Sequence, residues 1–276
     1  MEEGMVESVE ISPMSFSEFV QSLQVDVSSF DPEDIKTEKL LQRYLEFGGL
    51  QIVSGSNDEM ILKQLLTGIF YETFLKNVIA KHSVRNPWVL HSVLEFFALN
   101  IGNPIKLSAV KGYCSKSNTP VTNATLESYL SFIDESALFK KVLRYDVKSG
   151  SFLSGGECYY CTDTGLANAI LNFKHFDETA LMKNVVYLEF LRRGYNVYSA
   201  RVGLMSTDFI AISGDEVVCV QVLPSDDSKK ISQLLRPLHK LPDQIDKFLI
   251  SKYPVKIKSS VKNLTLADFL FNSSDN

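Results

Sequence analysis

The chain has 276 residues, of which 45% are hydrophobic and 22% charged, and this composition is typical of a globular protein with more than one packed unit. A net charge of -5 gives no support to a globally basic nucleic-acid binder. The acidic N-terminus is unlike a secretory signal, and charges interrupt the apolar stretches before the ~18 residues that a membrane helix needs. We therefore expect a cytoplasmic protein with no membrane contact. Four cysteines in a chain this long do not indicate a disulfide framework.

The first part of the chain, residues 1–86, is predicted to be helical. Ser15 and Glu18 have the spacing of a capping box, which predicts a short helix directly after Ser15. Helical periodicity continues over residues 35–47, up to a Gly-Gly pair, and over residues 58–82. The expected apolar face of this third helix consists of Ile61, Leu65, Ile69, Phe70, Phe74 and Val78.

The second part, residues 87–174, has the element order of a winged helix, which is three helices followed by a β-hairpin. The expected helices span residues 89–99, 107–114 and 124–133, and the expected strands span residues 138–145 and 157–162. Asp163 is expected to cap a further helix that begins at the next residue.

The third part, residues 175–276, alternates between helix and strand patterns. A helix is expected over residues 184–194, three strands over 196–201, 207–213 and 217–223, a helix over 228–241 and a strand over 247–251. The sequence as a whole therefore predicts an α/β protein of mixed α+β class.

Several short stretches, taken together and in order, resemble the C-terminal portion of a prokaryotic family of AAA+ ATPases. The stretches are residues 11–19 (ISPMSFSEF), 44–49 (YLEFGG), 100–102 (NIG), 160–166 (YCTDTGL), 187–195 (YLEFLRRGY), 207–210 (TDFI) and 220–222 (VQV). The resemblance implies a helical lid at 1–86, a winged helix at 87–174, and a degenerate PD-(D/E)xK endonuclease-like domain of order αβββαβ at 175–276.

The ATPase core of that family begins with a G-x-x-x-x-G-K-[ST] loop that cradles a triphosphate. No such string occurs in this sequence. The family usually has a Gly-Arg pair where Gly4 and Met5 stand here. We therefore expect this chain not to bind ATP.

The endonuclease-like resemblance implies a Mg²⁺ site made by an acid on the helix, an aspartate on the second strand and an acid on the third strand, with a lysine two positions later. Magnesium favours carboxylate oxygens, and the lysine stabilises the attacking hydroxide and the phosphate. Glu189 and Asp208 match by position, whereas Gln221 supplies a neutral amide and Leu223 replaces the lysine. Asp226 follows the third strand closely enough to serve as a substitute ligand. We nevertheless expect no catalytic residue and no cofactor, and Mg²⁺ belongs only to the alternative of a degenerate nuclease.

The winged helix offers a second candidate site. The third helix and its flanks, residues 123–135, carry only acidic charges, which disfavour base readout in the major groove. The hairpin that follows carries Lys140, Lys141, Arg144 and Lys148, and these cations can contact a phosphate backbone without reading its sequence. The alternative here is a winged-helix DNA-binding regulator.

Cys158 and Cys161 have C-x-x-C spacing, but a zinc site needs a second pair of ligands at typical spacing, which the chain does not supply. These observations favour a non-catalytic recognition or assembly module. Such a module is expected to bind a protein partner or another copy of itself, and to bind nucleic acid only weakly and without specificity.

Overall fold

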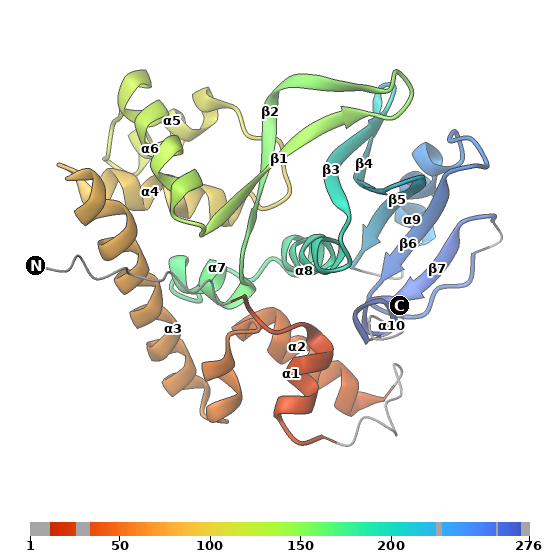
Figure 1. Ribbon diagram of the computed structural model, residues 1–276, viewed down its shortest axis with the longest axis horizontal. Helices are drawn as coiled ribbons and strands as arrows, with labels where there is room; N and C mark the ends of the chain where they lie inside the picture. The colour runs from red at the N-terminus through yellow and green to blue at the C-terminus, as the bar shows by residue number, and fades with distance from the viewer. Residues whose placement is uncertain (1–11, 26–33, 225–227, 258, 272–276) are drawn as a thin grey trace, which may run out of the picture.

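The protein combines helices and strands, as the sequence predicts, and its seven described strands form one mixed β-sheet (Figure 1). The computed structural model describes residues 12–25, 34–224, 228–257 and 259–271. Those ranges contain ten α-helices and a seven-stranded sheet of order β2-β1-β3-β4-β5-β6-β7. The α+β class expected from the periodicities is confirmed.

The N-terminal third is helical. Its elements are α1 (Phe16–Ser22), α2 (Ile35–Phe47), the 3-10 helix η2 (Gln51–Gly55), α3 (Glu59–Thr73) and the π-helix η3 (Phe74–Ala80). The predicted capping box is present, since Glu18 N donates to Ser15 Oγ and Ser15 N donates to Glu18 Oε2.

The apolar face predicted for α3 is partly wrong. Ile61 is 45% exposed and Leu65 is 37% exposed, whereas the residues that face the core are Leu62, Leu66 and Phe70. Two adjacent rows of apolar residues run along this helix, and periodicity alone does not tell which row is buried. One apolar row of α3 therefore faces solvent.

The middle third has the predicted order of three helices and a hairpin, with α7 after it. Its elements are α4 (Pro87–Leu99), α5 (Leu107–Lys116), α6 (Asn123–Glu135), β1 (Phe139–Asp146), β2 (Ser151–Cys161) and α7 (Thr164–Ile170). Thr122 caps α6 and Asp163 caps α7 through their side chains.

The C-terminal third begins earlier and continues further than predicted. Its elements are α8 (Glu178–Arg192), β3 (Asn196–Val202), β4 (Met205–Ser213), β5 (Glu216–Leu223), α9 (Ser228–Leu238), β6 (Asp246–Ser251), β7 (Lys262–Thr265) and α10 (Leu266–Phe271). Asp177 caps α8, so this helix starts six residues before the expected position. The sequence prediction did not include β7 and α10.

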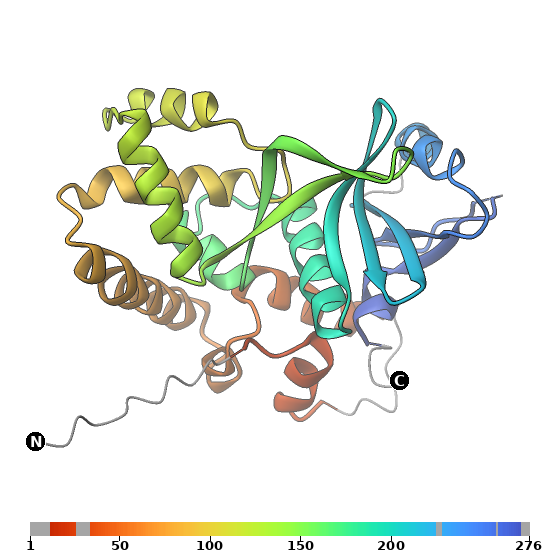
Figure 2. The same cartoon turned by 45° about the horizontal axis from the view of Figure 1, so that its top comes forward.

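The β1-β2 hairpin joins the same sheet as the C-terminal strands. β1 pairs in parallel with β3, with Arg144 opposite Ser199 (Figure 2). One hydrophobic core accordingly extends from α1 to α10, and a smaller one lies between the sheet and α9. The division at residues 86 and 174 stays a prediction, although the sheet is continuous across the second of these positions.

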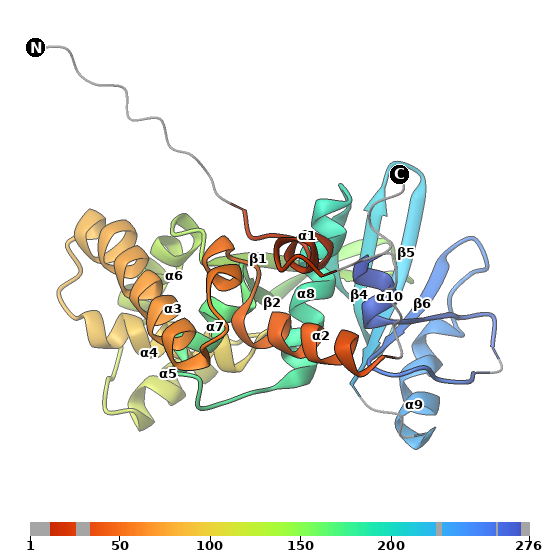
Figure 3. The ribbon, with the colours of Figure 1, turned by 90° about the horizontal axis from the view of Figure 1, so that it is seen from below.

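The C-terminal end of α2 docks on the N-terminal end of α7, and this contact links two of the stretches on which the family resemblance rests (Figure 3). Thr164 Oγ1 donates to Tyr44 O at 3.0 Å, and Asn168 Nδ2 donates to the carbonyls of Leu45 and Glu46. Helix C-termini leave carbonyls without intrahelical partners, and these side chains satisfy them.

A glycine makes the close approach between α2 and α7 feasible. Gly48 has φ 76°, and a Cβ at this position would lie 2.2 Å from Asp163 Oδ1. The adjacent Gly49 N donates to Asp163 Oδ2 at 2.7 Å. Asp163 therefore acts at two places, as the cap of α7 and as an anchor for the chain that leaves α2.

Within the described ranges, none of the helices is both long enough and apolar enough to cross a membrane.

Candidate functional site

Asp208 and Gln221 lie side by side on neighbouring strands. The antiparallel register of β4 and β5 pairs Phe209 with Val220, which brings the flanking residues Asp208 and Gln221 together. Gln221 Nε2 donates to Asp208 Oδ2 at 2.5 Å, and Val222 N donates to the same oxygen at 2.7 Å. The structure thus brings two of the three candidate metal ligands into contact.

Helix α8 lies end-on near the centre of Figure 1 and contacts β2 to β5. This helix adds a third residue to the pair formed by Asp208 and Gln221, and the sequence did not predict that residue. Lys183 Nζ lies 2.7 Å from Asp208 Oδ1, and the two side chains are only 19% and 9% exposed. We call Lys183, Asp208 and Gln221 the Asp208 cluster. Because α8 was expected to begin at residue 184, Lys183 lay outside the predicted helix, and the capping residue Asp177 was the signal that would have placed it inside.

Glu189 does not belong to the Asp208 cluster. Its side chain is 1% exposed and lies 3.3 Å from Arg192 Nη1 and 3.0 Å from Arg193 Nε. Arg192 also donates to the carbonyls of Pro13 and Met14. Glu189 is therefore the centre of a junction that connects α8 to the chain preceding α1.

The same junction reaches the C-terminal helix α10. Arg193 donates to the carbonyl of Phe269, and its guanidinium lies 4.3 Å from the centre of the Phe269 ring. An arginine that meets both a carbonyl and an aromatic face is held in one orientation. The ion pairs of Glu189 thus connect three segments that are distant in the sequence.

One buried acceptor of the Asp208 cluster has no partner. Gln221 Oε1 is buried without a hydrogen bond among the described residues. In the part of the chain that the structure describes, no group of three or more His, Cys, Asp or Glu side chains is arranged to hold a metal ion. Asp226, the substitute ligand considered above, lies outside the described residues.

The basic hairpin carries its four cations along β1 and the turn that follows. Lys141 Nζ lies 3.9 Å from Glu157 Oε1, and Arg144 Nη1 donates to Gly155 O at 3.4 Å. Lys140 and Lys148 are exposed. Part of the positive charge predicted for phosphate contact is therefore used within the hairpin itself.

The two cysteines of the C-x-x-C stretch are buried free thiols on β2. Burial raises the pKa of Cys161 to about 12 and also raises the pKa of Cys158. Thiolate is the reactive and metal-binding form, so neither residue is prepared for redox or metal chemistry at neutral pH.

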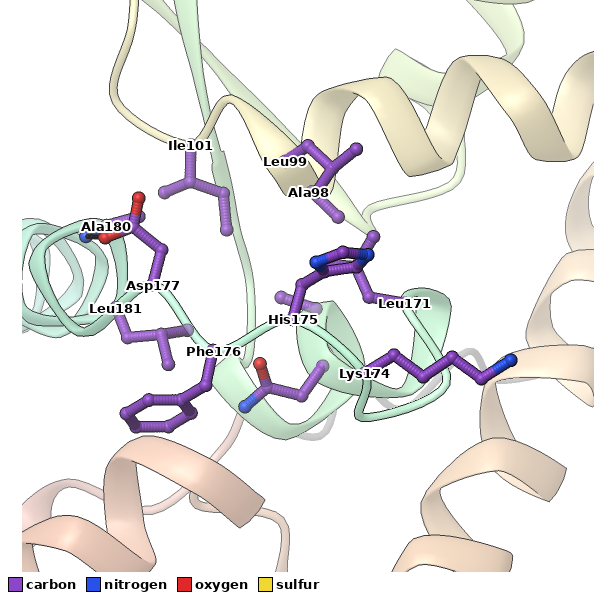
Figure 4. A pocket seen from close by; sticks show the side chains of 12 residues that line it. Ala98, Leu99, Ile101, Leu171, Lys174, His175, Phe176, Asp177, Ala180 and Leu181 are labelled. Atoms are coloured by element: carbon purple, nitrogen blue, oxygen red, sulfur yellow. Dashed lines mark hydrogen bonds between the residues drawn. The ribbon is translucent and has the colours of Figure 1, made fainter. Parts of the chain in front are cut away.

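A pocket of about 320 Å³ lies between the end of α4, α7 and the start of α8 (Figure 4). Two of its polar side chains already have structural partners, since Asp177 caps α8 and Asn168 donates to carbonyls of α2. Figure 4 shows Lys174 extending away from His175, so these two side chains do not converge. None of the predicted site residues lines this pocket.

Comparison with known proteins places the chain in a family. Residues 38–177, from the first turn of α2 to the residue that caps α8, match the model of a domain of unknown function, DUF8612. The chain belongs to this family. An uncharacterized protein of Haemophilus influenzae is 30% identical to it over 219 residues, which are 79% of this chain and 53% of that protein.

A second relative comes from an archaeon. An uncharacterized protein of Methanocaldococcus jannaschii is 27% identical over 224 residues, which are 77% of this chain and 48% of that protein. The chain thus spans about half the length of the curated relatives it matches. No solved structure matches it.

Proposed function

We propose that the chain is a non-catalytic recognition and assembly module that binds a protein partner and resembles the C-terminal half of an AAA+ ATPase. The observation that carries this proposal is the Asp208 cluster. Both oxygens of the Asp208 carboxylate are used by groups of the chain itself, namely the Lys183 ammonium, the Gln221 amide and the Val222 N–H. A metal ligand needs oxygens that are available to the ion.

The charge of Lys183 opposes a metal ion at the same place. An Mg²⁺ ion 4 Å from one carboxylate gains about 8 kcal/mol at an effective permittivity of about 20, and an ammonium at the same distance repels the ion by about as much. Asp208 therefore offers little net attraction to a divalent cation while Lys183 remains 2.7 Å away. Glu189 adds none, because its charge is matched by Arg192 and Arg193.

One observation favours the alternative of a Mg²⁺-dependent nuclease. Gln221 Oε1 is buried, has no hydrogen bond among the described residues, and belongs to a side chain that contacts Asp208. An amide oxygen is an acceptable but neutral ligand. The one carboxylate that could accompany this amide is Asp208, which is already paired with Lys183 and accepts from Gln221 and Val222, and this is why the alternative ranks second.

The hairpin supports a protein partner better than a nucleic acid. Two of its four cations already contact acceptors of the hairpin, and the preceding helix α6 is capped by a threonine and carries only acidic charges. A nucleic-acid surface needs several free cations facing one phosphate track. What remains of the nucleic-acid alternative is a weak contact between a phosphate backbone and the exposed Lys140 and Lys148.

A plasmid-nicking assay tests the proposal. The wild-type chain and Asp208→Ala should leave supercoiled DNA equally intact in the presence of Mg²⁺ or Mn²⁺, because neither protein can place a metal-bound hydroxide. Cleavage by the wild type that Asp208→Ala abolishes would overturn the proposal. Cleavage that persists in the variant would indicate a contaminating nuclease and calls for repeated purification before the comparison is scored.

A further inference from the structure

The exposed row of α3 and η3 is an apolar stripe on the outside of the molecule. Ile61, Leu65, Tyr71 and Leu75 are each between 37% and 52% exposed, and Gly68 lies among them. Figure 1 shows α3 along one margin of the molecule, away from the sheet. We call these five residues the α3 stripe. Large apolar side chains gathered in this way on a surface mark an interaction site more often than chance exposure does.

Gly68 has no explanation within the chain's own packing. It lies in the middle of α3, where glycine costs about 1 kcal/mol relative to alanine. A Cβ added at Gly68 would meet nothing within 4 Å. The space above this residue is therefore open, and a second helix can approach the backbone closely there, as small residues at helix crossings permit.

In sequence position, the α3 stripe is symmetric about Gly68. Ile61 and Leu75 lie seven residues before and after it, and Leu65 and Tyr71 lie three residues before and after it. If a second copy of α3 crosses antiparallel at Gly68, Ile61 meets the partner's Leu75 and Leu65 meets the partner's Tyr71. A surface that complements itself in this way is what a two-fold, isologous dimer requires.

The charges of the helix favour the same orientation. In the antiparallel register, Gln64 faces the partner's Glu72 and Met60 faces the partner's Lys76, so no like charges oppose each other. In a parallel register each of these charged residues would face its own copy, which is unfavourable. A groove of about 780 Å³ beside the stripe, lined in part by Met60, Thr67 and Phe173, leaves room for the side chains of a second helix.

We propose that the α3 stripe is the surface through which two copies of this chain form an antiparallel dimer centred on Gly68. The inference rests on the proposed assembly function and names its partner as a second copy. One helix pair buries an area at the low end of specific interfaces, so we expect a reversible dimer with a dissociation constant on the order of 10 µM.

Sedimentation analysis over a range of concentrations tests the dimer. Gly68→Leu should raise the dissociation constant at least about 30-fold, because the added side chain separates the helices at the centre of the interface. The matched control is Gly112→Leu, because Gly112 is also an exposed helical glycine whose added Cβ meets nothing within 4 Å. This control should dimerise like the wild type. A monomeric wild type, or a Gly68→Leu variant that dimerises normally, would overturn the inference.

Oxidative cross-linking tests the orientation without depending on Gly68→Leu. Under a copper-phenanthroline oxidant, a mixture of Ile61→Cys and Leu75→Cys chains should form covalent dimers, whereas either variant alone should not. In the antiparallel dimer two copies of Cys at 61 lie about 21 Å apart, beyond the reach of a disulfide. The four native cysteines are buried and give little background. Cross-linking of each variant with itself, or of none, contradicts the proposal.

The experiments can overturn the proposed dimer and the proposed non-catalytic function independently of each other. A chain that is monomeric but does not cleave DNA would remove the dimer and leave the non-catalytic function standing. A chain that dimerises through the α3 stripe but cleaves DNA through Asp208 would do the reverse.

Discussion

Replacing Glu189 with alanine should lower the free energy of unfolding by about 3–5 kcal/mol, with or without divalent metal ions. The variant leaves Arg192 and Arg193 without the carboxylate that lies 3.3 and 3.0 Å from them. Both arginines also hold carbonyls, one before α1 and one in α10, so the loss loosens the junction of three segments. Chemical denaturation monitored by circular dichroism measures the effect.

An exposed ion pair provides the control for this measurement. Asp246 and Lys262 form a pair at 2.9 Å in which both side chains are about half exposed. Asp246→Ala should cost less than about 1 kcal/mol, because solvent screens such a pair. If Glu189→Ala costs as little as this control, or destabilises the protein only when Mg²⁺ is present, Glu189 is not the structural residue described above.

Asp163 should make the protein less stable as the pH rises from about 4 to about 6. Burial raises the pKa of this carboxyl from 3.8 to about 6, in spite of the hydrogen bonds from Gly49 and Leu166 that favour its ionised form. Between these two values the unfolded chain has released the proton while the folded chain still holds it. The stability that the protonated Asp163 provides is therefore fully present below pH 4 and is lost as the pH rises through 6, a change of about 3 kcal/mol.

The pH effect is isolated by comparison with Asp163→Asn, which has no proton to release. The unfolding free energy of the wild type relative to this variant should fall between pH 4 and pH 7, in denaturation curves recorded at each pH. A constant difference would show that Asp163 has an ordinary pKa in the folded protein. A difference that grows with pH would show that the hydrogen bonds outweigh burial.

Local signals in the sequence were sufficient for most of the fold. The capping box at Ser15 and the cap at Asp163 each act within four residues, so they can be predicted without knowing the tertiary structure. The parallel pairing of β1 with β3 was not predictable in this way, because it joins residues more than 50 positions apart. The rotation of α3 about its own axis could not be predicted from the sequence either, since packing against the rest of the chain decides which of two apolar rows is buried.

Only part of the candidate site could be predicted from the sequence, because some of its contacts follow from local patterns and others depend on tertiary packing. Asp208 and Gln221 occupy neighbouring antiparallel strands joined by a tight turn, so their proximity follows from the strand pattern. The direction in which the Glu189 side chain points depends on the rotation of α8 against the sheet, and so does its pairing with Arg192 and Arg193. Lys183 was missed because the start of α8 was placed too late.

The most direct test of the central claim is a titration of the wild-type chain with Mn²⁺, followed by the relaxation of water protons. Because Asp208 is already held by Lys183, Gln221 and Val222, we expect no saturable binding at Mn²⁺ concentrations on the order of 1 mM. A saturable site that Asp208→Ala removes would show that the metal displaces Lys183, and it would contradict the proposal that this chain is a non-catalytic module.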